Sequence, residues 1–419
     1  MQITDYTLGN GARIILAPQA DARSATTLIM YPVGSRYEPE KLSGVSHYIE
    51  HLMFKGTQKR KNTLTLTREI DRLGADYNAF TSKEYTGYYI KAGAEYVQTS
   101  LDILSDMLFY STFDAKEMER EKGPIVEELR MYKDNPIMRI GDLIEEVLFT
   151  GPMGRDIGGT VKHVKSYKRD DVLAYRDKYY GPNNMTVVIA GKIPEDIQTL
   201  LGNYIGAEKA RPLPKQRFTP TELASNRKQD RIRVEEKDTE QAQLMLAWPA
   251  FAYGDARNPA LGVLNTILGG SMSSRLFIKV RERLGLAYTV RSGAEQYRDT
   301  GYAYVRAGLE PNNLNKAINV ITKETMKLVE KDVTKRELAD AKTHIRGALT
   351  LGMEDSSAIA NWYAKGALFH DTLHAPEEKL AKIDAVTIED VRKVAKQIFK
   401  SNQMRVAIVG KVDAKRVKF

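Results

Sequence analysis

The sequence predicts an α+β fold of two duplicated domains, in each of which a mostly antiparallel sheet is backed by helices. Three observations support this prediction: β-rich apolar runs that follow turn residues, helical periodicity in separate blocks, and an internal repeat of about half the chain length. A chain of 419 residues is also long enough for two or three domains.

The repeat is clearest in two segments of each half. YGPNNMTVVIAGKIPED, from Tyr180, is similar to FKSNQMRVAIVGKVDAK, from Phe399, which lies 219 positions later. YTGYYIKAGAEYVQTSLDIL, from Tyr85, is similar to RDTGYAYVRAGLEPNNLNKAINVI, from Arg298. Because solenoid repeats span only ~20–50 residues, a period this long indicates two related domains.

A segment rich in proline and charge separates the two halves. It reads EKARPLPKQRFTPTELASNRKQDR from Glu208 and has little apolar periodicity, as is typical of a linker. We therefore expect one domain at residues 1–207, a linker at 208–231 and a second domain at 232–419.

The strands of the first half are predicted by residue type and alternation. ARIILAP and ATTLIMYPV are rich in β-branched and apolar residues and follow the turn signal Asn10-Gly11. Alternation from Tyr85 to Ala92 predicts another strand, and MTVVIAG predicts the strand that closes this half.

Helices are predicted between these strands. SHYIEHLMF and residues 116–132 have helical periodicity. In residues 96–108, Leu101, Leu104 and Leu108 lie on one helical face.

The composition argues against several functional classes. The chain has no cysteine, which excludes disulfides, Cys-ligated metal and a thiol nucleophile. The net charge is +9, but the basic residues are scattered among 54 acidic ones, so we expect no nucleic-acid partner. No run of about 18 apolar residues occurs, so we expect no transmembrane segment. The N-terminus does not resemble a signal peptide. We expect a cytoplasmic protein, or a periplasmic or organellar one if a targeting segment has been removed.

His47, Glu50 and His51 form the pattern H-x-x-E-H. On a helix, the two histidines lie one turn apart on one face and can reach the same metal ion. Glu50 lies on the same side, where it can face a metal-bound water. With either Asp or Glu allowed at the acidic position, chance would produce roughly 0.01 such matches in this composition. A catalytic zinc takes three protein ligands and keeps an open position, so the third ligand must come from elsewhere in the chain.

Apolar residues surround the motif in GVSHYIEHLMFKGT, so its helix is expected to be largely buried. Two buried histidines and a glutamate need polar partners, and a metal ion supplies one. The alternative, two surface or core histidines on one helix, leaves the three groups without a common role.

SHYIEHLMFKGT resembles the signature of the inverzincin peptidases of family M16, of the insulysin, pitrilysin and mitochondrial-processing-peptidase type. The resemblance covers nearly the whole chain as one half-length unit. It implies the family's fold and one Zn²⁺ per chain, held by His47, His51 and a glutamate on a later helix. It also implies that Glu50 is the general base acting on zinc-bound water.

Two adjacent residues, Glu127 and Glu128, match the position of the family's third ligand. Glu128 continues an i, i+3/i+4 stripe of Met118, Glu121 and Ile125, whereas Glu127 points about 100° away. We therefore prefer Glu128 as the metal ligand. Glu121 resembles the family's second acidic residue, and we expect it to support catalysis by orienting a ligand.

The second half has no such cluster, because the corresponding windows ALGVLNTILGG and THIRGALTL hold no histidine–glutamate constellation. Its metal site is expected to be inactive. LFIKVRERLGLAYTVRSG resembles the family segment in which an arginine and a tyrosine contact substrate, here Arg281 and Tyr288, with Arg283 as a competitor for the arginine role. An arginine can hold a peptide carbonyl, and a tyrosine hydroxyl can donate to an oxyanion.

GADYNAFTSKEYTGYYIKA resembles the family's edge strand, to which an extended substrate adds as a further strand. Asn78, Ala79 and Phe80 are the expected contact positions.

Together these features predict a zinc-dependent endopeptidase that cleaves peptides or unfolded segments inside a dimeric chamber. In such a homodimer, Arg281 and Tyr288 of one protomer would reach the zinc of the other. Two alternatives stay open: a processing peptidase for one specific precursor, and a non-catalytic scaffold or partner subunit.

Overall fold

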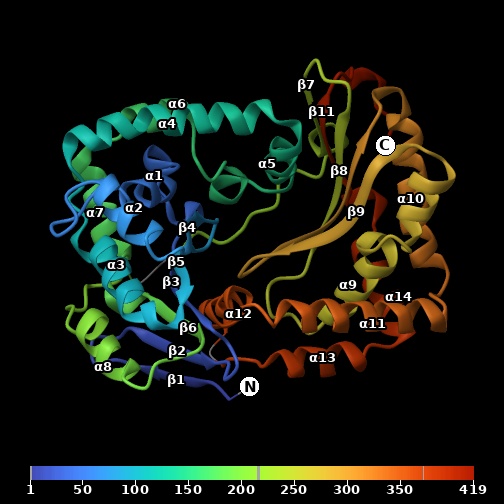
Figure 1. Cartoon of the computed structure of the whole chain (residues 1–419). Coiled ribbons are helices and arrows are strands. Elements are labelled where there is room, and N and C mark those ends of the chain that lie inside the picture. Colours follow the sequence, from blue (N-terminus) through green and yellow to red (C-terminus); the bar gives the residue numbers. More distant parts are fainter. Residues whose placement is uncertain (1, 215–217, 371) are drawn as a thin grey trace. The chain divides into compact units, whose positions relative to one another are not determined.

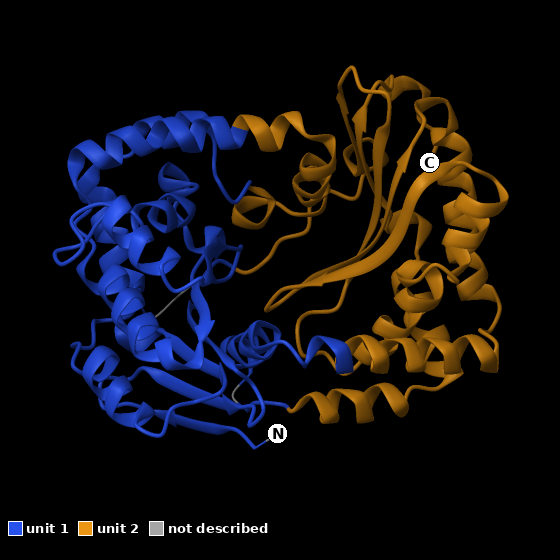
Figure 2. Ribbon diagram, viewed as in Figure 1, with its two compact units in different colours: residues 1–129, 156–219, 350–374 blue, residues 130–155, 220–349, 375–419 orange. Residues whose placement is uncertain are grey.

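The computed structural model describes residues 2–214, 218–370 and 372–419, which divide into two compact units (Figure 2). Unit 1 comprises residues 1–129, 156–219 and 350–374, and unit 2 comprises residues 130–155, 220–349 and 375–419. Each unit contains one sheet and its covering helices (Figure 1). The predicted α+β class is therefore confirmed.

The sheet of unit 1 has six strands in the order β1-β2-β6-β3-β5-β4. Only β2 and β6 pair in parallel; all other neighbours are antiparallel. Its strands are β1 (Thr4–Thr7), β2 (Arg13–Pro18), β3 (Ser24–Tyr31), β4 (Asp76–Thr81), β5 (Thr86–Gly93) and β6 (Thr186–Gly191). In this sheet β4 is an edge strand, hydrogen-bonded to β5 alone.

The sheet of unit 2 has the order β7-β11-β8-β10-β9, again with one parallel pair, β7 with β11. Its strands are β7 (Ile232–Glu236), β8 (Ala242–Ala250), β9 (Ala287–Gln296), β10 (Gly301–Leu309) and β11 (Arg405–Gly410). This order, with its one parallel pair, corresponds strand by strand to β2-β6-β3-β5-β4 of unit 1. The correspondence confirms the predicted duplication. Gly191 and Gly410 end the equivalent strands β6 and β11, and both have positive φ.

Helices cover the sheets of both units. Those of unit 1 include α1 (Val45–Leu52), α2 (Thr63–Asp71), α3 (Val97–Tyr110), α6 (Val161–Ser166), α7 (Arg169–Tyr179), α8 (Ile197–Leu201) and α12 (Ser356–Phe369). Those of unit 2 include α5 (Pro136–Leu148), α9 (Asn258–Asn265), α10 (Leu314–Glu330), α13 (Pro376–Asp384) and α14 (Ile388–Ile398). Two long helices, α4 (Ala115–Asp134) and α11 (Lys335–Gly352), have residues in both units.

Each sheet has a hydrophobic core on both faces, and the second core includes a helix from the other half of the sequence. In unit 1, Ile15, Leu28 and Val188 form a core with α12. In unit 2, Met245 and Ala407 form a core with α5. The predicted domains at 1–207 and 232–419 are continuous in sequence. The compact units instead exchange helices: α12 belongs to unit 1 and α5 belongs to unit 2. The physical reason for this exchange is that each sheet has a second apolar face to bury.

No helix in the described part of the chain is both long and apolar enough to cross a membrane.

Candidate metal centre

Helix α1 carries three of the predicted site residues and is fixed at its N-terminus by a buried carboxylate. Gly44 precedes the helix with φ 93°, a left-handed conformation that favours glycine. Glu38 accepts hydrogen bonds from the Gly44 and Ser46 amides at 2.6 and 2.8 Å, which satisfies donors that a helix start leaves without partners.

The apolar residues of α1 are buried, and its polar ones form a separate partly exposed face. Tyr48 and Ile49 are fully buried, while His47, Glu50 and His51 are half-buried. The Tyr48 hydroxyl donates to the carbonyl of Met118 on α4, which joins the two site helices.

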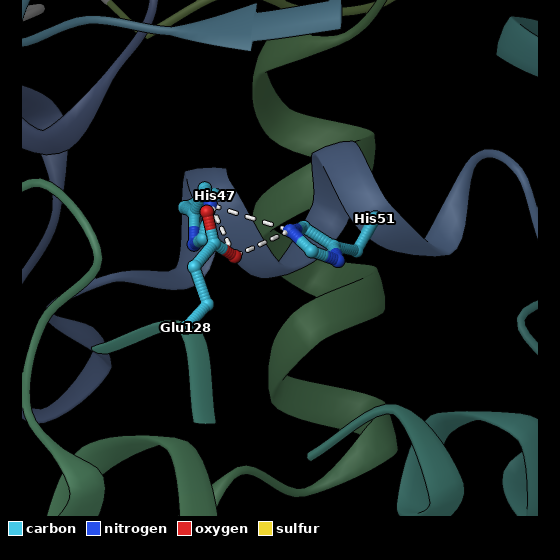
Figure 3. A group of neighbouring side chains, drawn as sticks. All are labelled: His47, His51 and Glu128. Atoms are coloured by element: carbon cyan, nitrogen blue, oxygen red, sulfur yellow. Dashed lines mark hydrogen bonds and ion pairs between the residues drawn. The ribbon is translucent and has the colours of Figure 1, made fainter. Parts of the chain in front are cut away.

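His47, His51 and Glu128 converge on one point, as Figure 3 shows. The Nε2 atoms of the two histidines are 3.3 Å apart. Glu128 Oε2 lies 3.5 Å from His47 Nε2 and 3.2 Å from His51 Nε2. Among the described residues, this is the one group of three or more His, Asp or Glu side chains spaced to hold a metal ion.

The cluster needs a cation. When His51 donates from Nδ1, its Nε2 carries a lone pair that faces another imidazole nitrogen and a carboxylate. Burial by itself would lower the pKa of His51, but hydrogen bonds with Glu121 and Glu128 raise it to about 9. Hydrogen bonds with His47 and His51 hold the pKa of Glu128 well below its usual range. These facing imidazole nitrogens and carboxylate oxygen therefore form a set of donors suited to a cation.

The spacing of these three atoms fits zinc. A tetrahedral zinc with bonds of about 2.0–2.1 Å has ligand atoms about 3.3 Å apart, close to the three separations measured here. Two imidazoles and one carboxylate are also a donor set found in catalytic zinc sites, which keep a fourth position open.

Glu121 contacts His51 on the side of the ring that faces away from the cluster. Its Oε1 accepts from His51 Nδ1 at 2.9 Å, and its Oε2 accepts from Lys55 Nζ at 2.6 Å. The carboxylate is nearly buried, and burial would raise its pKa, but His51 and Lys55 together lower it. Glu121 therefore stays ionised and fixes the ring so that Nε2 faces the cluster.

Glu50 does not join the ligand group. Its Oε2 accepts a hydrogen bond of 2.6 Å from the hydroxyl of Thr81, the last residue of β4. Burial raises the pKa of Glu50, while Thr81, His47 and His51 oppose that rise. A carboxylate with a raised pKa beside such a group of potential metal ligands is suited to accept a proton.

The other predicted contact residues of unit 1 lie on β4 and alternate between its faces. Ala79 belongs to the core that includes α1, and Phe80 packs on the opposite face, with its ring 6.1 Å from that of Tyr85. Asn78 Oδ1 accepts from the Ala79 amide at 2.9 Å. The Phe80 side chain thus points away from the face that carries Thr81 and Glu50.

Unit 2 carries the predicted arginine–tyrosine pair. Arg281 lies in a π-helical segment, Phe277–Arg283, and its guanidinium carbon lies 4.8 and 5.3 Å from the ring centres of Phe277 and Tyr288. Tyr288 is 70% exposed at the start of β9. An exposed tyrosine beside an arginine is available to a ligand.

Comparison with known proteins decides the family. Residues 13–161 match the profile of the insulinase family (peptidase family M16), and residues 166–345 match that of the peptidase M16 inactive domain. An uncharacterized zinc protease of Bacillus subtilis is 36% identical over 95% of this chain and 96% of its own length. The chain belongs to peptidase family M16. An uncharacterized zinc protease of Streptomyces coelicolor is 35% identical over 98% of this chain and 90% of the relative.

Solved structures show that the M16 fold extends over the whole chain. A protease from Helicobacter pylori matches with a TM-score of 0.90 at 23% identity, over 98% of this chain and 99% of that chain. A peptidase M16 inactive domain from Pseudomonas fluorescens matches with a TM-score of 0.89 at 18% identity, over 100% of both chains.

Three residues of the M16 site were not singled out from the sequence. Lys55 and Glu38 act through charge on Glu121 and on the start of α1. Thr81 contacts Glu50 across 31 positions of sequence. Of these three residues, only Thr81 could be placed from the sequence, because strand alternation puts it on the same face of its strand as Ala79.

Proposed function

We propose that this chain is a zinc-dependent endopeptidase that cleaves peptides or unfolded polypeptide segments, with Glu50 as the general base. The main support is the convergence of His47, His51 and Glu128 at zinc-like spacing beside a carboxylate that is not a ligand. The relatives named as zinc proteases, which are similar over nearly their full length, support the same proposal.

The residues have distinct roles in this proposal. His47, His51 and Glu128 hold the zinc, while Glu121 and Lys55 orient His51. Bound zinc supplies an acidified water and polarises the scissile carbonyl. Glu50 takes a proton from the attacking water and later delivers it to the leaving amine. Arg281 holds a substrate carbonyl, and Tyr288 donates to the developing oxyanion.

The edge position of β4 supports the proposed substrate class. Because β4 pairs with β5 alone, its other edge offers backbone groups to an extended chain. Backbone hydrogen bonding at positions 78–80 would bind many sequences, provided that the substrate is extended. Most backbone groups of a folded protein are already paired within its own secondary structure, so peptides and unfolded segments are the proposed substrates.

The active form proposed here is a homodimer that encloses a chamber. Each chain carries one zinc cluster and one Arg281/Tyr288 pair, and the pair of one protomer would serve the zinc of the other. This arrangement would complete each site only in the dimer.

Peptide digestion with controlled metal content tests the proposal. The purified chain should contain about one zinc per protomer, cut unfolded peptides of tens of residues, and leave a stable folded protein intact. A chelator should abolish cleavage, and added zinc should restore it. Zinc binding without cleavage of any peptide in a diverse set would favour a scaffold or partner subunit. Cleavage of a single precursor would favour a processing peptidase.

A further inference from the structure

We infer that Thr81 is a positioning residue that holds the Glu50 carboxylate in the orientation required for proton transfer. The inference rests on the proposed function, because it assigns Thr81 a role through Glu50. It also makes β4 the element that carries both the substrate edge and the group that orients the base.

The contact itself is short and has no competitor in the described chain. Thr81 Oγ1 donates to Glu50 Oε2 at 2.6 Å, and no other described residue donates to Glu50. Hydrogen bonds to a carboxylate are about twice as strong as those between neutral groups. Without Thr81, the Glu50 side chain would rotate about its terminal bond, whose preferred angles are broad.

Pairing with β5 fixes the backbone around Thr81. Thr81 pairs with Thr86 of β5, and the Ser82 amide donates to the carbonyl of Tyr85 at 2.8 Å, which closes the β4–β5 turn. Helix α1 lies against β4, so Glu50 and Thr81 approach from neighbouring elements. Thr81 therefore offers a donor whose position does not depend on the mobility of a long side chain.

The single contact distinguishes the two oxygens of Glu50. Oε2 accepts from the Thr81 hydroxyl, whereas Oε1 accepts from no described residue, so we assign Oε1 as the oxygen that faces the water. In the reaction, a water O–H bond breaks, its oxygen forms a bond to the scissile carbonyl carbon, and the proton goes to Oε1. That proton then moves to the leaving nitrogen as the C–N bond breaks, which returns Glu50 to the carboxylate. Thr81 keeps its hydrogen throughout.

Threonine, serine and valine variants separate this role from packing. Thr81→Val keeps the shape and removes the donor, so kcat should fall about 10-fold, because misplacement of a reacting group costs about this much or more. KM, zinc content and the thermal midpoint should stay close to those of the wild type. Thr81→Ser restores the hydroxyl and should return kcat to within about threefold of the wild type.

Thr86→Val is the matched control. Thr86 faces Thr81 across the ladder, but its buried hydroxyl donates to the Val33 carbonyl at 2.8 Å and not to Glu50. This variant should lose thermal stability while keeping the kcat of its folded, zinc-loaded fraction. A crystal structure of zinc-loaded Thr81→Val supplies a readout independent of activity: the Glu50 carboxylate should occupy more than one orientation there, and one orientation in Thr81→Ser.

Two results would overturn the inference while leaving the peptidase proposal intact: an unchanged kcat in Thr81→Val, or an equal loss in Thr81→Val and Thr81→Ser. Failure of the proposed function has a different signature. In that case the wild type itself would not hydrolyse peptides, or Glu50→Gln would retain full turnover.

Discussion

Glu127 and Glu128 are neighbours on α4, and only Glu128 reaches the two histidines. Glu128→Gln should lower zinc affinity by at least about 100-fold, because loss of a direct ligand exceeds the ~10–100-fold cost of losing an outer partner. Glu127→Gln makes the same chemical change one residue away and should leave zinc affinity within about twofold of the wild type. Competition with a zinc-binding dye measures both. The opposite ranking would mean that the helix phase assigned to α4 is wrong.

His51 makes zinc binding depend on pH. Its pKa is raised to about 9 in the metal-free protein, so at pH 7 the cluster holds a proton that zinc must displace. Zinc affinity should therefore rise about 10-fold per pH unit between pH 7 and 8.5, and level off above the pKa. Calorimetry in two buffers of different ionisation enthalpy should show about one proton released per zinc at pH 7.5. Binding with no proton release would contradict this charge state.

The residue-level chemistry was only partly readable from the sequence. Spacing alone brought His47, Glu50 and His51 to one helical face, and helix periodicity favoured Glu128 over Glu127. Lys55 could not be assigned in this way, and strand alternation places Thr81 on a face without identifying its partner. The contacts of these two residues with Glu121 and Glu50 depend on how α1 packs against α4 and β4. Local patterns specify faces of an element, whereas such partners follow from tertiary packing.

At the scale of elements, the start of α1 is the most constrained point of the site. Gly44 has φ 93°, and a Cβ there would lie 2.3 Å from the Gly158 carbonyl oxygen. Gly44→Ala should therefore destabilise the fold by about 1–3 kcal/mol through backbone strain, with more from the clash, and should weaken zinc binding by displacing α1. Thermal unfolding and zinc titration measure the two effects.

Gly347→Ala on α11 is the matched control. A Cβ there meets nothing within 4 Å, and alanine in a helix interior is favoured over glycine by about 0.5–1 kcal/mol. This variant should be as stable as the wild type or more so, with unchanged zinc affinity. Equal destabilisation by both substitutions would show that Gly44 at the start of α1 has no special role.

The predicted elements agree with the structure where their pattern was local. The strand predicted from Tyr85 to Ala92 is β5, and the helix predicted over residues 116–132 is α4. The exchange of α5 and α12 between the halves was not predicted, because an apolar helix face indicates burial without identifying the sheet that buries it. The linker predicted at 208–231 separates the halves of the sequence, but it does not indicate which unit each helix joins.

At the scale of the whole molecule, the proposed sharing of each active site between two protomers predicts complementation between two inactive chains. Glu50→Gln removes the proposed base, and Arg281→Ala/Tyr288→Phe removes the proposed substrate contacts. In a mixed dimer, one site would combine an intact zinc motif with an intact Arg/Tyr pair, and the other would carry both defects. Peptide hydrolysis should return to at most half of the wild-type activity per mixed dimer.

Subunit exchange must be measured in the same sample, for example by fluorescence transfer between labelled chains. If exchange occurs and no activity returns, either each site is built within one chain or both intact sites are needed. A fully active monomer in sedimentation would reject the shared-site proposal outright.

The most direct test of the proposed peptidase is the turnover of an unfolded peptide by zinc-loaded Glu50→Gln beside the wild type at equal zinc content. Glu50 is not a ligand in this structure, so the variant should bind zinc as the wild type does. Its kcat should nevertheless fall at least ~100-fold, because general-base catalysis contributes this much or more. Wild-type turnover by a fully zinc-loaded Glu50→Gln chain would contradict the assignment of Glu50 as the base and, with it, the proposed mechanism.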